Sequence, residues 1–76
     1  MTDAELLKTL HQLCDAYVDD DTAAIARLEP LATQIGEELN RRGGIEEMRR
    51  VFHALRPRRG ARTLEMHWDG IGDWRG

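Results

Sequence analysis

Apolar residues recur at intervals of three and four along most of the chain, and this spacing restricts the fold more than any other feature. Over residues 6–18 they form one broad stripe, over 25–39 they keep an interval pattern of 3, 4, 3 and 4, and over 45–55 a third stripe follows. A period near 3.6 places such residues on one face of an amphipathic helix. We therefore predict an all-α fold, a small bundle of three helices over about 3–19, 22–42 and 45–56.

Short-range signals indicate where these helices begin and end. Thr2 and Glu5 have the spacing of a capping box, in which each side chain accepts a hydrogen bond from the backbone N–H of the other residue. The run Asp19–Asp21 ends the first helix and supplies the N-cap of the second. We expect Gly43 to take the left-handed conformation that follows a helix, and Pro57 to end the third helix.

Pro30 and Gly36 lie inside the second predicted helix. Proline removes a helix hydrogen bond, yet the apolar pattern continues from Leu28 to Ala32 across it. We predict one helix kinked at Pro30, with the proline on the side opposite the apolar stripe. Gly36 is less favourable in a helix than alanine by up to about 1 kcal/mol, and the close approach of another helix would explain it.

The C-terminal segment 61–74 has two interpretations. Leu64, Met66 and Trp68 alternate as in a strand, whereas Ala61, Leu64 and Trp68 have helical spacing. We favour a short C-terminal helix, because an isolated two-stranded hairpin is marginal in water. The two tryptophans, Trp68 and Trp74, either fold back over the open end of the core or form part of an ordered aromatic tail that packs on a partner.

Charge is segregated along the chain, although the net charge is only −3. Residues 1–40 hold nine acidic residues and two basic ones, whereas residues 41–63 hold eight arginines and two glutamates. We expect the arginines to pair with the acidic half, within the chain or across a dimer. The alternative is that the Arg41–Arg62 segment binds nucleic acid. Glu46 and Glu47 at the start of the third predicted helix oppose this alternative, because their charge would repel phosphates.

The candidate interaction residues come from the aromatic tail and from the basic segment. They are Trp68, Ile71, Trp74, Arg49, Arg50, Arg56, Arg58, Arg59 and Arg62.

The sequence has no catalytic or metal-binding pattern with the required spacing. Cys14 is the only cysteine, which excludes an internal disulfide and a cysteine zinc cage within one chain. The Asp19–Asp21 run lacks the glycine and glutamate that an EF-hand loop needs downstream. Polar residues surround Trp68, and we attribute them to an ordinary turn: Glu65, His67, Asp69 and Asp73. We predict a non-enzymatic protein without metal or other cofactors.

The length of 76 residues allows one domain, residues 1–76, and a chain of this size buries only about 60% of its unfolded surface. Self-association would bury additional apolar surface and so compensate for this small core. We therefore predict a helical interaction or assembly module that forms a dimer or binds another protein, with a nucleic-acid-binding accessory protein as the alternative. The sequence has no signal-peptide pattern and no apolar stretch near the roughly 18 residues of a membrane span, so we expect a cytoplasmic protein without a membrane partner.

Overall fold

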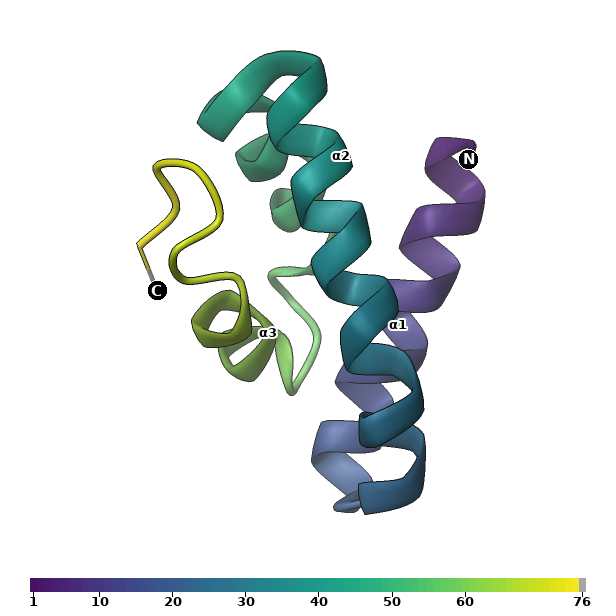
Figure 1. Cartoon of the computed structure of the whole chain (residues 1–76). Coiled ribbons are helices and arrows are strands. Elements are labelled where there is room, and N and C mark those ends of the chain that lie inside the picture. The colour runs from purple at the N-terminus through teal and green to yellow at the C-terminus, as the bar shows by residue number, and fades with distance from the viewer. Residues whose placement is uncertain (76) are drawn as a thin grey trace.

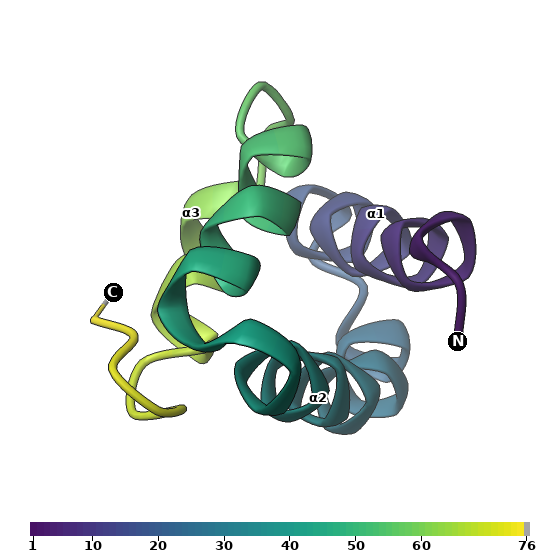
Figure 2. The ribbon, with the colours of Figure 1, turned by 90° about the horizontal axis from the view of Figure 1, so that it is seen from above.

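A computed structural model describes residues 1–75 of the chain. These residues form three helices and no strand, which confirms the predicted all-α bundle. The helices are α1 (Asp3–Asp19), α2 (Thr22–Leu55) and α3 (Ala61–His67). In Figure 1, α1 and the first half of α2 lie side by side and run antiparallel, while the second half of α2 turns back at the top of the view. Figure 2 shows α1 and the two halves of α2 on three sides of the bundle.

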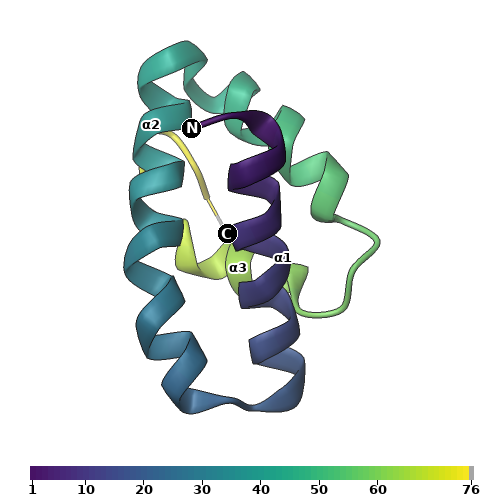
Figure 3. The ribbon, with the colours of Figure 1, turned by 90° about the vertical axis from the view of Figure 1, so that its right-hand side faces the viewer.

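The predicted caps join α1 to α2. The Thr2 N–H donates to Glu5 Oε1 at 3.0 Å and the Glu5 N–H donates to Thr2 Oγ1 at 3.2 Å, which confirms the capping box. Asp20 has a left-handed φ of 55° after α1, and the Asp21 carboxylate accepts from the Ala24 N–H at 3.1 Å at the start of α2. These contacts form the turn at which the chain reverses direction (Figure 3).

The break in α2 lies at the pair Gly43–Gly44, between the second and third predicted helices, and the helix continues across Pro30 as predicted. Pro30 is exposed, as predicted, so water can reach the Ala26 carbonyl that the proline leaves without its helix donor. The non-helical dihedral angles inside α2 belong to Gly43 (φ −160°, ψ 17°) and Gly44 (φ 68°, ψ −152°). The prediction of one helix that continues across Pro30 is confirmed, whereas Gly44 rather than Gly43 takes the positive φ. The predicted third helix is the second half of α2.

Gly36 is buried where the C-terminal segment crosses α2. A Cβ atom there would lie 2.9 Å from Ile71 Cδ1 and 3.0 Å from Trp68 Nε1. The Trp68 indole N–H donates to the Ala32 carbonyl at 2.9 Å, one helical turn before Gly36. The close approach predicted at Gly36 is thus made by the residues that follow α3, and not by a helix packed on a helix.

The core closes within one chain, because residues from all three helices and from the C-terminal segment pack into one cluster. Trp68 is fully buried and Trp74 is 4% exposed, so both indoles fold back over the core. The short helix predicted for the C-terminal segment is confirmed as α3. Val18, which belongs to the first apolar stripe, is instead 42% exposed, since it lies in the last turn of α1 beside an open hollow under Arg58 and Arg59.

Candidate functional site

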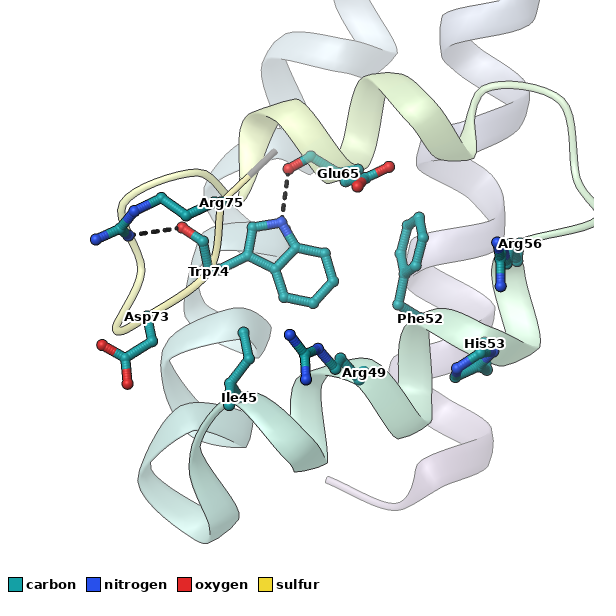
Figure 4. Close-up of a pocket in the computed structure, with 9 residues that line it drawn as sticks. All are labelled: Ile45, Arg49, Phe52, His53, Arg56, Glu65, Asp73, Trp74 and Arg75. Atoms are coloured by element: carbon teal, nitrogen blue, oxygen red, sulfur yellow. Dashed lines mark hydrogen bonds between the residues drawn. The ribbon is translucent and has the colours of Figure 1, made fainter.

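A groove of about 370 Å³ lies between the second half of α2 and the tail, by which we mean residues 68–75 (Figure 4). This volume is within the range of about 300–1,000 Å³ that is usual for ligand pockets, at its small end. We call it the α2–tail groove. It is lined by Ile45, Arg49, Phe52, His53, Arg56, Glu65, Asp73, Trp74 and Arg75.

Aromatic rings form the floor of the α2–tail groove. The Trp74 ring meets Phe52 edge-on with centroids 5.4 Å apart, and it meets Trp68 edge-on at 5.2 Å. The Trp74 indole N–H donates to the Glu65 carbonyl at 2.8 Å. The tail can turn tightly enough to place Trp74 here because Gly70, which donates its N–H to the Trp74 carbonyl, has a φ of 94° that favours glycine. The floor is therefore held by packing and by backbone hydrogen bonds.

Basic side chains from α2 form one wall of the groove, and the opposite side carries Glu65, Asp73 and Arg75, whose guanidinium donates to the Trp74 carbonyl. Arg49, His53 and Arg56 are exposed, and within residues 1–75 no ion pair joins any of them to a carboxylate. Glu65 lines the groove from α3 and Asp73 lines it from the tail, although the Asp73 carboxylate points away from Arg49 in Figure 4. The groove can thus accept both carboxylates and cations from a bound molecule.

Four of the other arginines pair with carboxylates of the chain. Arg50 contacts Asp3 at 3.0 Å, and the hydrogen bond from Arg50 holds the pKa of Asp3 below its usual value. Arg58 contacts Asp15 at 3.0 Å, and Glu38 accepts hydrogen bonds from both Arg41 and Arg42. The prediction that arginines pair with the acidic half is confirmed within one chain for Arg41, Arg42, Arg50 and Arg58.

The structure therefore divides the predicted interaction residues among several places. Arg49 and Arg56 line the α2–tail groove and Trp74 forms its floor. Trp68 lies in the core, and Ile71 is half-buried against it. Arg50 and Arg58 pair with α1, Arg59 lines a separate hollow with Asp15 and Asp19, and Arg62 is exposed on α3 outside the groove lining.

Sequence reasoning missed His53, Glu65, Asp73 and Arg75 as groove residues. His53 could have been found from the sequence, because it lies four residues after Arg49 and three before Arg56 and must share one helix face with them. The others lie on α3 and the tail, and their position depends on how Trp74 packs. No pattern within the sequence gives that position.

A polar network outside the groove joins the three helices. The Tyr17 hydroxyl donates to Glu29 Oε2 at 2.7 Å, and burial together with this hydrogen bond raises the pKa of Tyr17. His67 Nδ1 lies 3.5 Å from the same oxygen, while its Nε2 lies 2.9 Å from Thr33 Oγ1 and 3.2 Å from the Glu29 carbonyl. A carbonyl only accepts, so the contact with Nε2 requires a proton there, and a protonated Nε2 cannot take a proton from Thr33. We interpret the network as structural.

Cys14 and His11 show no sign of a metal centre. Burial raises the pKa of the Cys14 thiol to about 11 and lowers that of His11. Within residues 1–75 no three His, Cys, Asp or Glu side chains are grouped closely enough to hold a metal ion. In the same part of the chain, no helix combines the length and apolar character needed to cross a membrane.

Comparison with known proteins adds no relative, since the chain matches no known protein family, no curated protein and no solved structure.

Proposed function

We propose that this chain is a non-enzymatic, cytoplasmic protein-interaction module that binds an acidic segment of a partner protein in the α2–tail groove. The observation that carries the proposal is the set of basic side chains on one wall of the groove, the guanidinium groups of Arg49 and Arg56 and the imidazole of His53, which have no carboxylate partner within residues 1–75. A carboxylate from a partner can pair with them without breaking an existing ion pair. Planar guanidinium groups suit such contacts, because they bind carboxylates in bidentate geometry.

The charges of the opposite side favour a protein partner over a nucleic acid. Glu65 and Asp73 line the same groove, and a continuous row of phosphates would be repelled by them. A polypeptide can present acidic side chains to the α2 wall and basic ones to these two residues. In addition, Arg50 and Arg58 are already paired with α1, so the basic segment does not offer one unbroken cationic surface.

Self-association has less support than a different partner protein. The features that suggested a dimer have contacts inside one chain: Gly36 faces Trp68 and Ile71, both tryptophans are buried, and several arginines pair with the acidic half. One surface feature would suit a second copy, namely a hollow near the N-terminus beside the exposed side chains of Met1 and Leu31. We therefore place a partner protein ahead of a second copy, and light scattering on a sizing column tests the dimer directly.

The proposal predicts that a fluorescently labelled acidic peptide containing leucine binds the protein at about 50 mM salt, where electrostatic attraction is strong. The double variant Arg49→Glu/Arg56→Glu should weaken binding by about tenfold or more, since it replaces two attractive contacts with repulsive ones. The matched control is Arg59→Glu/Arg62→Glu, which changes the net charge equally outside the groove and should leave affinity within about twofold.

Labelled single- and double-stranded DNA of matched length serve as competitors in the same anisotropy titration. If DNA binds and the peptide does not, with Arg58 and Arg59 as the most sensitive positions, the nucleic-acid alternative replaces the proposal. If the peptide binds equally well to both double variants, its binding depends on net charge alone and the groove is not the site.

A further inference from the structure

The wall that α2 contributes to the groove is one face of a helix. Ile45, Arg49, Phe52 and Arg56 follow at intervals of four, three and four residues, which places them in one row along the helix axis. The apolar members of the row are half-buried and the basic members are exposed. The row is about 16 Å long at a rise of 1.5 Å per residue. It therefore presents apolar and basic groups alternately to whatever lies in the groove.

Two of the common ways to bind a peptide do not suit this groove. A peptide added as a strand needs an open sheet edge, and residues 1–75 contain no strand. A polyproline-type peptide needs exposed aromatic faces, but Trp74 is only 4% exposed and its ring packs edge-on against Phe52. A helix laid in a groove needs apolar contacts at helical intervals, and the α2 row supplies them through Ile45 and Phe52.

The spacing of the basic side chains also fits a helix better than an extended chain. Arg49, His53 and Arg56 are separated along the axis of α2 by about 6 Å and then about 4.5 Å. A partner helix lying along α2 repeats its side chains at these same rises, at positions i, i+4 and i+7. An extended chain repeats its side chains on one face every 7 Å or so and falls out of register after the first pair.

We propose that the occupant of the α2–tail groove is an acidic amphipathic helix of a partner protein. Its apolar side chains contact Ile45 and Phe52, and its carboxylates, spaced at i, i+4 and i+7, face Arg49, His53 and Arg56. A basic side chain on its other edge faces Glu65. This inference rests on the proposed function, because it specifies the conformation of the acidic segment assumed there.

Three synthetic peptides of equal net charge test the inference. The first places glutamate and leucine at helical intervals, the second has the same residues in an order without helical period, and the third is the first with a central alanine replaced by proline, which breaks a helix. We expect the first peptide to bind at least about tenfold more tightly than the other two and to gain helicity when bound, as measured by anisotropy and circular dichroism.

The two indole N–H resonances report where the peptide binds. Trp74 forms the floor of the groove, whereas Trp68 is fully buried with its N–H donated to the Ala32 carbonyl. In a ¹H–¹⁵N spectrum the Trp74 indole resonance should therefore shift more than that of Trp68. The Arg49→Glu/Arg56→Glu variant, with its fold verified by circular dichroism, should remove the shift, and Arg62→Glu should keep it.

The outcomes separate this inference from the proposed function. Equal binding of all three peptides in the groove overturns the helical occupant and leaves an acidic partner in place. If none of the three binds, the proposed function is overturned as well. A peptide that binds but leaves the Trp74 indole resonance unchanged occupies a different surface, and the assignment of the groove is then wrong.

Discussion

The second half of α2 has two sides that use similar residues in different ways. The side facing α1 places Arg50 against Asp3 and Glu47, so its cation is paired within the chain. The side facing the tail packs Phe52 against Trp74, while Arg49 and Arg56 lack an ion pair within residues 1–75. The α1 side thus combines apolar packing with ion pairs, whereas the tail side relies on aromatic packing and leaves its cations available.

This difference separates stability from binding along a single helix. Surface ion pairs contribute little to folding, but they remove cations from the set that a partner can use. Where the chain closes its surface with tryptophans instead, the neighbouring arginines stay available. The same helix can therefore serve the fold on one side and recognition on the other.

The strongest test of the tail side is Trp68→Ala, which removes a fully buried aromatic side chain and its hydrogen bond to the Ala32 carbonyl. We expect the free energy of unfolding in urea to fall by about 3–5 kcal/mol, as for other large aromatic truncations in a core. Met66→Ala is the control, since Met66 is 62% exposed and its removal should change stability by no more than about 0.5 kcal/mol.

If Trp68→Ala does not fold at all, Trp68→Phe gives a measurable variant with a smaller loss in the same direction. A loss below about 1 kcal/mol for the alanine variant would mean that the tail does not close the core. Aromatic packing would then not distinguish the tail side from the α1 side.

Alkaline pH tests the α1 side through the buried Cys14. Burial raises the pKa of this thiol from 9.0 to about 11 in the folded protein. The unfolded chain therefore loses the proton first, so stability is intact below pH 9 and falls as the pH rises from 9 towards 11. We expect a loss of about 2 kcal/mol by the upper end of this range in urea denaturation.

Cys14→Ala is the control for this pH dependence, because it removes the thiol while it keeps an apolar residue. The variant should be less stable at neutral pH and should lose less stability as the pH rises. Tyr17, whose pKa is also raised by burial, acts in the same direction above its ordinary value of 10.0. An identical alkaline slope in the wild type and Cys14→Ala would contradict the role assigned to the thiol.

The regions that could be predicted from the sequence are those in which the interacting residues are close along the chain. Thr2 and Glu5 are three residues apart, and their capping box formed as predicted. The groove depends on Phe52 meeting Trp74, which are 22 positions apart, and on a tail whose course is set by the contacts of Trp68. Helical periodicity shows that such residues face inward, but it does not show which residues they meet.

The break in α2 lies where the sequence predicted one helix to end and the next to begin, and what remained to explain is why Pro30 does not interrupt the helix as well. Pro30 and the pair Gly43–Gly44 both disfavour a helix, and their relative effect depends on what surrounds them. Pro30 is exposed, so water can satisfy the freed carbonyl and the helix continues. At the glycine pair the chain must turn so that the third apolar stripe can reach the core, and Gly44 accepts the positive φ without steric cost. The surroundings of the two points therefore decide which of them interrupts the helix.

The smallest effects come from two arginines that are neighbours in the sequence. Adjacent residues on a helix differ by about 100° in direction, which places Arg50 towards Asp3 and Arg49 towards the groove. Arg50→Ala should lower the melting temperature slightly, and this loss should shrink at high salt, where surface ion pairs are screened. Arg49→Ala should leave the melting temperature unchanged and weaken binding of the helical acidic peptide by about threefold to fivefold, as for one exposed ion pair.

The two variants serve as controls for each other, because each removes one guanidinium group from the same helical turn. Arg50→Ala removes a cation that is already neutralised by Asp3 and Glu47, so peptide affinity should change little. If both variants weaken the peptide equally, the peptide responds to the overall field of the basic segment and not to the groove wall. Equal losses of melting temperature would instead show that Arg49 has a partner within the fold, and the two sides of α2 would no longer differ in how they use their charges.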